Sequence, residues 1–215
     1  GSYREYKICS MAPPSSGGIA LVQILNILEN IDLSKFDHNS EKYLKILMSA
    51  MDYAFRDRAK YLGDPDFFKV PQDLLTSKKY ADDIFHQIKE KKLPLKANVK
   101  ILEGEETTHF SILDKWGNAV SNTYTLNTAY GSGIIPNGTG ILMNNEMDDF
   151  SSKPGHPNVY GLIGSEANKI EPKKTPLSSM SPVIVFRNEK PYLITGSPGG
   201  STIITSVLQE ILNVL

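Results

Sequence analysis

The stretch TTHFSILDKWGNAVSNTYTLN, residues 107–127, decides how this chain can fold. Strand-forming residues on both sides of the turn sequence DKWGN (114–118) predict an antiparallel β-hairpin. Helical periodicity dominates the residues before this hairpin, whereas short strands, turns and most of the glycines follow it. The sequence therefore predicts an α+β fold in which the hairpin marks the change from helices to strands.

The length of the hairpin turn determines which residues face one another. With a five-residue turn, Leu113 lies opposite Ala119 and Thr107 lies opposite Thr125. Cross-strand partners are about 4.5–5.5 Å apart at Cβ, which is within reach of a hydrogen bond between hydroxyls. A four-residue turn would bring Tyr124 opposite Thr107 instead. The pattern fits either a nucleophilic threonine steadied by a second one or two threonines that simply favour strands.

Three helices are expected upstream of the hairpin. Residues 19–28 are apolar on most sides, which indicates a buried helix. Ser40 is a suitable N-cap for a second helix, which the GDP sequence at 63–65 ends. A third helix is expected over residues 77–92, and the unpatterned residues 93–106 are expected to form an exposed connection.

Two segments after the hairpin carry groups suited to a charged ligand. The sequence NNEMDDF (144–150) crowds acids and amides together, and its Glu146 and Asp149 could converge on one ammonium group. The alternative is a polar loop with Asx turns, and the spacing of an EF-hand loop is absent. The sequence SSMSP (178–182) offers three hydroxyls directly before an expected strand.

A second hairpin and a final helix complete the pattern. Residues 182–195 predict two strands around the turn NEK, and apolar residues recur at helical spacing from 203 to 215. Gly199 and Gly200 lie directly before this helix, where backbone N–H groups and the helix dipole favour negative charge. Two adjacent glycines there fit an oxyanion hole or, equally, a tight strand-to-helix turn.

Composition excludes several classes of protein and site. The 215 residues carry a formal net charge of −1, which excludes a binder that relies on neutralising nucleic-acid phosphates. The one cysteine and the spacing of the four histidines predict no metal site. No apolar run is long enough to span a membrane. His109 alternates in step with Thr107 and fits either a catalytic base or a structural histidine.

Six segments together resemble γ-glutamyltranspeptidase, a family of the N-terminal-nucleophile hydrolase superfamily. The resemblance extends over nearly the whole chain, and the segments occur in that family's order: PPSSGG (13–18), DRAKYLGDPDF (57–67), TTHFSILDKWGNAVSNTYTLN (107–127), NNEMDDFS (144–151), PLSSMSP (176–182) and GSPGGS (196–201). The resemblance implies a stacked αββα fold, here incomplete, and a zymogen that cuts its own backbone before Thr107. Residues 1–106 would then end the large subunit and residues 107–215 begin the small subunit, both contributing to one domain.

The resemblance also implies catalytic roles. Thr107 would be the nucleophile, with its new α-amino group as the base and Thr125 as its hydrogen-bonding partner. The backbone N–H groups of Gly199 and Gly200 would form the oxyanion hole. Tyr160 would belong to a loop that covers the substrate.

The remaining implied residues bind the donor substrate. Asn127, Glu146 and Asp149 would hold its α-ammonium group, and Ser178 and Ser179 its α-carboxylate. The implied reaction is attack on the γ-amide of glutathione or another γ-glutamyl donor, followed by transfer of the glutamyl group to water, an amino acid or a peptide. This chemistry needs no cofactor, and the family implies a periplasmic or secreted location.

The chain departs from the family in its length. Family members carry more large subunit before residue 1 and more small subunit after residue 215, and an arginine in the preceding portion normally pairs with the donor carboxylate. We therefore expect this chain alone to be uncleaved at Glu106–Thr107, inactive and able to self-associate. The alternatives are an amidohydrolase of the cephalosporin acylase type, against which the polar residues at 127, 146 and 149 argue, and a catalytically silent, self-associating fragment.

Overall fold

The computed structural model describes residues 1–90, 106–158 and 161–215. The helices are α1 Gly17–Leu28, α2 Glu41–Tyr61, α3 Gln72–Leu75, α4 Lys78–Glu90 and α5 Ile203–Val214, with short 3-10 helices η1 Leu33–Lys35, η2 Glu146–Asp149, η3 Glu166–Asn168 and η4 Gly200–Thr202. The strands are β1 Ser2–Tyr3, β2 Tyr6–Ser10, β3 Thr108–Leu113, β4 Ala119–Tyr124, β5 Val183–Arg187 and β6 Lys190–Thr195.

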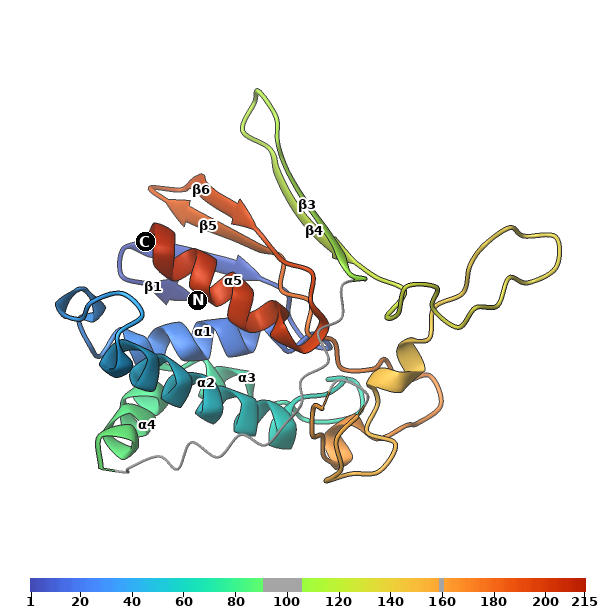
Figure 1. Ribbon diagram of the computed structural model, residues 1–215, viewed down its shortest axis with the longest axis horizontal. Coiled ribbons are helices and arrows are strands. Elements are labelled where there is room, and N and C mark those ends of the chain that lie inside the picture. Colours follow the sequence, from blue (N-terminus) through green and yellow to red (C-terminus); the bar gives the residue numbers. More distant parts are fainter. Residues whose placement is uncertain (91–105, 159–160) are drawn as a thin grey trace.

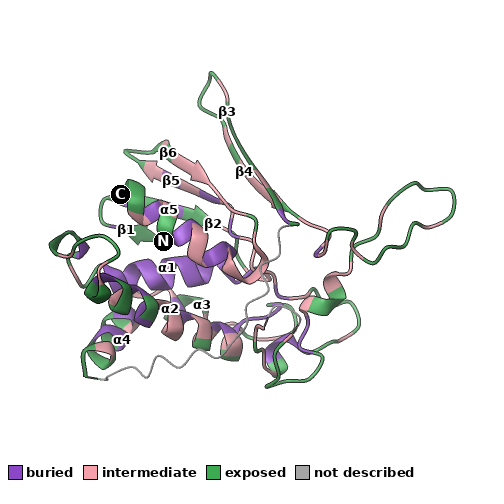
Figure 2. Cartoon of the chain, viewed as in Figure 1, coloured by how far each residue is buried: buried purple, intermediate pink, exposed green. Residues whose placement is uncertain are grey.

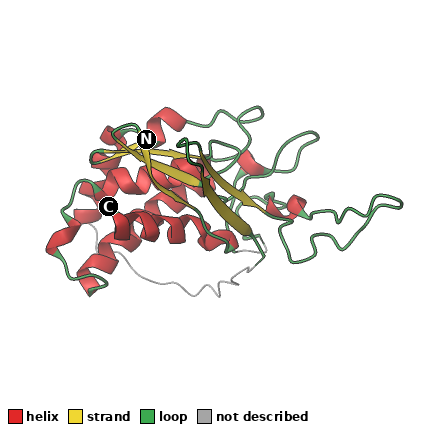
Figure 3. Cartoon of the chain, turned by 90° about the horizontal axis from the view of Figure 1, so that it is seen from above, coloured by secondary structure: helices red, strands yellow, loops and turns green. Residues whose placement is uncertain are grey.

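In Figure 1, α2 and α4 lie on one side of α1, and the β3–β4 hairpin stands beyond β5 and β6 on the other side. Seen from above, the strands lie across the helices (Figure 3).

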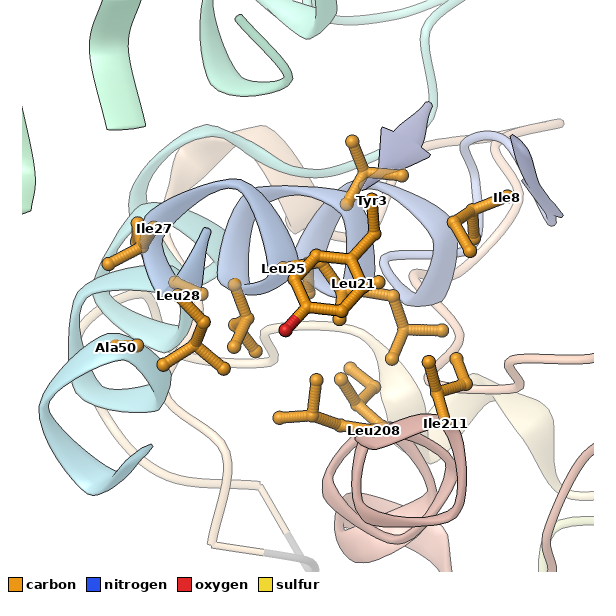
Figure 4. Close-up of a cluster of buried hydrophobic side chains, with 14 of the residues drawn as sticks. Tyr3, Ile8, Leu21, Leu25, Ile27, Leu28, Ala50, Leu208 and Ile211 are labelled. Carbon is orange, nitrogen blue, oxygen red and sulfur yellow. The ribbon is translucent and has the colours of Figure 1, made fainter. Parts of the chain in front are cut away.

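Helix α1 forms the centre of the core, as its apolar sequence predicts. Every residue of α1 is buried (Figure 2), and α2, α4, α5 and β1 all pack against it. Leu21 and Leu25 of α1 belong to the same buried cluster as Ala50 of α2 and Leu208 of α5 (Figure 4). Burying one such leucine fully stabilises a fold by roughly 1.5–3 kcal/mol, so α1 is held by its neighbours rather than by helix propensity.

Helix α2 begins and ends as the sequence predicts. Ser40 is its N-cap, and the Ser40 Oγ accepts a hydrogen bond from the backbone N–H of Tyr43 at 3.3 Å. After Tyr61 the chain turns around Asp64, whose carboxylate accepts hydrogen bonds from the backbone N–H groups of Asp66 at 3.0 Å and Thr175 at 2.8 Å. Asp64 therefore ties the end of α2 to the segment that leads into the SSMSP sequence.

The third predicted helix is shorter than expected within the described residues. It is α4, which begins at Lys78 and ends at Glu90, and the short helix α3 before it is not predicted from the sequence. The expected end of this helix at residues 91–92 lies outside the described residues. So does the expected connection over 93–106, apart from Glu106.

A four-stranded antiparallel sheet joins the two ends of the chain. Its strand order is β1-β2-β5-β6, with Lys7 opposite Phe186 and Ser10 opposite Val183. Helices dominate the described residues before the β3–β4 hairpin, as predicted, but the sequence did not predict strands β1 and β2. The sequence of β2 does alternate, since Tyr6 and Ile8 are buried and the residues after each are exposed, but five residues are too few to show the period clearly.

The β3–β4 hairpin has the register that the five-residue turn predicts. Leu113 pairs with Ala119, and the ladder continues to Thr108 opposite Tyr124. Thr107 and Thr125 are the next residues on the two strands. The turn is held by Asp114, whose carboxylate accepts hydrogen bonds from three N–H groups of Trp116 and Asn118 at 2.7–2.9 Å.

The second predicted hairpin also forms, with a tighter turn than expected. The turn consists of Asn188 and Glu189, which have φ angles of 50° and 59°, and Lys190 already belongs to β6. Two residues with positive φ are typical of the type I′ turns that fit the twist of antiparallel strands.

Among the described residues, no helix is long and apolar enough to cross a membrane. The same residues contain no group of three or more side chains that could hold a metal ion.

Candidate active site

A pocket lies where the base of the β3–β4 hairpin meets η2, the SSMSP loop and the N-terminal end of α5. Its lining consists of Arg58, Thr107, Thr125, Asn127, Glu146, Asp149, Asn158, Leu162, Leu177, Ser178, Ser179, Met180, Gly200, Ser201 and Ile203. Every predicted site residue that the structure describes lines this pocket except Gly199, which precedes Gly200. Tyr160, the predicted residue of the covering loop, lies outside the described residues.

The two threonines enter the pocket from the open end of the hairpin. Thr107 is buried directly before β3, and Thr125 directly follows β4. The Thr125 Oγ1 accepts a hydrogen bond from the backbone N–H of Asn127 at 2.9 Å. No hydrogen bond joins the hydroxyls of Thr107 and Thr125 in the described part of the chain. The hairpin thus places both hydroxyls in one pocket, with Thr125 oriented by the backbone that follows it.

Asn127 connects the hairpin to the acidic loop. Its φ angle is 78°, in the left-handed region that asparagine tolerates better than most residues. Its side-chain Nδ2 donates a hydrogen bond to the backbone carbonyl of Asn145 at 3.2 Å. The carboxylates of η2 are therefore positioned relative to the hairpin by a residue that itself lines the pocket.

Glu146 and Asp149 lie at the two ends of η2, and both line the pocket. Their carboxyl groups share a hydrogen bond. Burial raises the pKa of Asp149, and the neighbouring charge of Glu146 raises it further, whereas the positive charge of Arg58 lowers it. Burial also raises the pKa of Glu146. Both shifts favour protonation of one carboxyl group of the pair, and a cation beside the pair would favour its ionised form.

The SSMSP loop presents two hydroxyls to the pocket. The Ser178 Oγ accepts a hydrogen bond from the backbone N–H of Met180 at 3.0 Å. The Ser179 Oγ accepts one from Nη2 of Arg58 at 3.1 Å. Each hydroxyl is oriented by a donor from the protein, so its own proton is available to an acceptor in the pocket.

The glycine pair forms the turn into α5. Gly199 and Gly200 have φ angles of 122° and 54°, a region that residues with a Cβ rarely adopt. Gly200 begins η4, which continues directly into α5, so its N–H lies at the positive end of a helix dipole. This end of the pocket is suited to a negatively charged oxygen.

Arg58 is the site residue that the sequence reading missed. It is buried near the end of α2, and its Nε donates a hydrogen bond to the Ser16 Oγ at 3.0 Å. Burial lowers the pKa of Arg58 to about 10, which still leaves it protonated at neutral pH. The sequence does contain a pattern that indicates a buried Arg58. Leu47, Ala50 and Ala54 recur at helical spacing on the buried face of α2, and Arg58 is the next position on that face. A charge on an apolar helix face indicates a buried polar site.

His109 lies outside the lining of the pocket. Its Nδ1 is hydrogen-bonded to the Thr123 Oγ1 at 2.8 Å and its Nε2 to the Ser111 Oγ at 3.0 Å. Burial lowers the pKa of His109, which favours the neutral ring. The geometry favours the structural interpretation of this histidine over the catalytic one.

The family model for γ-glutamyltranspeptidase matches residues 1–215 of the chain. The chain belongs to the γ-glutamyltranspeptidase family. It is 55% identical over 218 residues to the glutathione hydrolase proenzyme of Escherichia coli strain K12, an alignment that covers 99% of this chain and 38% of that protein. It is also 36% identical over 216 residues to the acylase ACY 1 proenzyme of Pseudomonas sp. strain SE83, covering 100% of this chain and 37% of that protein.

A solved structure confirms the fold expected of this γ-glutamyltranspeptidase family member. The cephalosporin acylase from Bacillus halodurans superposes with a TM-score of 0.76 at 24% sequence identity, covering 99% of this chain and 36% of that one. The chain thus shares its mixed helix-and-sheet architecture with that acylase. The chain spans less than two fifths of the length of the two curated relatives, at 38% and 37%.

Proposed function

We propose that the protein containing this chain hydrolyses and transfers the γ-glutamyl group of glutathione and other γ-glutamyl amides. The observation that carries this proposal is the charge pattern of a single pocket. Two carboxylates, Glu146 and Asp149, line one part of it, and the hydroxyls of Ser178 and Ser179 line another. A γ-glutamyl group carries an α-ammonium and an α-carboxylate on one carbon, which matches this pattern, and Thr107 lies in the same pocket.

The proposed mechanism begins with self-cleavage before Thr107. The Thr107 Oγ attacks the carbonyl carbon of Glu106, the C–N bond breaks as the hydroxyl proton passes to the Thr107 nitrogen, and water then hydrolyses the resulting ester. This leaves a carboxylate on Glu106, a free α-amino group on Thr107 and its regenerated hydroxyl. That amine then takes the hydroxyl proton while the Thr107 Oγ attacks the γ-carbonyl carbon of the donor. The N–H groups of Gly199 and Gly200 stabilise the oxyanion. As the C–N bond breaks, the amine returns the proton to the leaving group, and a γ-glutamyl ester on Thr107 remains.

The second half-reaction repeats these steps with a different nucleophile. Water, an amino acid or a peptide attacks the ester carbonyl, and its proton passes to the Thr107 amine and then to the departing Thr107 oxygen. Water yields glutamate, whereas an amine yields a new γ-glutamyl amide. The proposed bond-making and bond-breaking steps use Thr107 and the glycine turn and require no cofactor.

Donor selection in this proposal depends on the ammonium site. Asn127, Glu146 and Asp149 hold the α-ammonium, and Ser178 and Ser179 donate hydrogen bonds to the α-carboxylate. A hydrogen bond to a charged group contributes roughly 1.5–3 kcal/mol, so this site distinguishes a γ-glutamyl group from a glutaryl group that lacks the ammonium. That argues against the alternative acylase activity, which the likeness to the acylase ACY 1 proenzyme otherwise favours.

We further propose that the 215-residue chain by itself remains uncleaved and inactive, and that its exposed elements allow it to self-associate. Support comes from its share of the Escherichia coli relative, 38%, and from the family resemblance, which implies a further arginine for the donor carboxylate before residue 1. Several apolar side chains of the hairpin are also exposed, including Phe110, Ile112 and Val120. A periplasmic or secreted location of the whole protein is part of the same proposal.

The test compares γ-glutamyl p-nitroanilide with glutaryl p-nitroanilide as substrates. The full-length protein is expected to release the aniline from the γ-glutamyl compound with the higher kcat/KM, and Thr107→Ala is expected to abolish the release. A preference for the glutaryl compound would establish the acylase alternative. The 215-residue chain alone is expected to give one band on a denaturing gel and no release.

A further inference from the structure

Arg58 joins two segments of the chain that lie far apart in sequence. Its Nε donates to the Ser16 Oγ at 3.0 Å and its Nη2 donates to the Ser179 Oγ at 3.1 Å. Only 5% of the Arg58 surface is exposed. The planar guanidinium can make these two bonds at once, in directions that a lysine ammonium on a flexible chain does not fix.

Ser16 extends the same network to the neighbouring serine. The Ser16 Oγ donates a hydrogen bond to the backbone carbonyl of Ser178 at 2.7 Å, and the Ser16 N–H donates to the same carbonyl at 2.9 Å. The N–H of Ser178 in turn donates to the carbonyl of Pro14 at 2.9 Å. The start of α1 therefore holds the backbone of Ser178, and Arg58 holds the side chain of Ser179.

The direction of the Arg58 bond decides what the Ser179 hydroxyl can do. A serine hydroxyl has one proton and accepts through its lone pairs. Because the Ser179 Oγ accepts from Arg58, its own proton points to a different partner. A carboxylate in the pocket is such a partner, whereas a second hydrogen-bond donor is not. Arg58 is also the only positively charged residue among the described residues that line the pocket, where Glu146 and Asp149 are acidic.

We propose that Arg58 is a positioning residue for the α-carboxylate of the donor, acting by holding the Ser179 hydroxyl as a hydrogen-bond donor. This inference rests on the proposed function. It assigns a task to two segments that the reaction scheme leaves without one, the DRAKYLGDPDF segment that carries Arg58 and the PPSSGG segment that carries Ser16.

The test is a double-mutant cycle in the processed full-length enzyme with γ-glutamyl p-nitroanilide. Arg58→Lys keeps the positive charge and removes the two-point geometry. It is expected to raise KM roughly tenfold while kcat changes by less than about threefold, because the donor is bound less well and the chemistry at Thr107 is unaltered. In a Ser179→Ala background the same change is expected to raise KM by less than about twofold.

Arg56→Lys is the matched control. Arg56 lies on the same helix, forms an exposed ion pair with Asp52 at 2.7 Å and does not line the pocket. The control is expected to leave KM and kcat unchanged, and two bands on a denaturing gel establish that each variant has matured.

If Arg58→Lys raises KM by the same factor in the wild-type and in the Ser179→Ala background, the inference is overturned, since Arg58 would then act independently of the Ser179 hydroxyl. A fall in kcat at unchanged KM would also overturn it. If Arg58→Lys does not mature, Ser16→Ala replaces it in the cycle, with the same two outcomes. A wild-type enzyme that releases no aniline from the γ-glutamyl compound refutes the proposed function instead.

Discussion

Asp149→Asn tests the carboxylate pair in the proposed donor site. The substitution preserves the size of the side chain and removes its negative charge. Among the described residues that line the pocket, Glu146 and Asp149 are the two acids, and their carboxyl groups interact through a hydrogen bond. We expect the processed full-length enzyme to bind γ-glutamyl donors more weakly and to keep its acyl-transfer chemistry, because Thr107 and the glycine turn are unchanged.

The magnitude follows from the environment of the pair. One hydrogen bond between charged groups contributes roughly 1.5–3 kcal/mol, which corresponds to about 10- to 100-fold in affinity. Burial and the neighbouring Glu146 both raise the pKa of Asp149. Part of the binding free energy of the ammonium is therefore spent on removing the proton that the raised pKa favours on the carboxyl pair. The expected rise in KM is therefore near the lower limit, roughly tenfold.

The same pKa shift predicts a pH dependence. The ammonium binds the ionised pair, so donor affinity should improve as pH rises through the raised pKa of Asp149, above the range where carboxyl groups ordinarily titrate. In the Asp149→Asn variant no proton is shared between two carboxyl groups, and this dependence should weaken.

The assay measures kcat and KM for γ-glutamyl p-nitroanilide from mildly acidic to mildly alkaline pH. Asp148→Asn is the matched control, because Asp148 belongs to the same short helix η2, is exposed and does not line the pocket. When the pair is fully ionised, as in the proposed ammonium-bound state, each variant removes one negative charge from the loop. An unchanged KM for Asp149→Asn at every pH, or the same rise in the control, would refute the reasoning.

Three further predictions concern the nucleophile, the glycine turn and the core. Thr107→Ala should prevent maturation and activity of the full-length protein, and Thr107→Ser should retain some of both; a denaturing gel that shows two bands for Thr107→Ala contradicts this. Gly199→Ala should lower kcat roughly tenfold or more and leave KM little changed. The reason is that a Cβ at this position would lie 2.6 Å from the Thr202 Oγ1 and would displace the adjacent N–H groups. Full activity of this variant would exclude Gly199 from the oxyanion hole. Leu25→Ala should lower the free energy of unfolding by roughly 2–5 kcal/mol, since Leu25 is fully buried. Urea denaturation measures this change, and a loss below about 1 kcal/mol would contradict the place of Leu25 in the core.

The sequence by itself determined the local features of this protein. The turn around Asp114, the register that brings Thr107 and Thr125 to the same end, the buried helix α1 and the Ser40 cap all depend on neighbours within a few residues. Such features are readable because turn chemistry, helical period and capping act over short distances along the chain. The order of the six segments also identified the family, since their order carries more information than any one of them.

Only the tertiary structure decided which distant residues share the pocket. Arg58 is hydrogen-bonded to Ser179, 121 residues away in sequence, and to Ser16, 42 residues away. The local sequence indicates neither contact, apart from the presence of a charged residue on an apolar helix face. Strand β2 likewise becomes recognisable only through its pairing with β5. The raised pKa of Asp149 has the same origin, because burial and the approach of other charges exist only once the chain has folded around them.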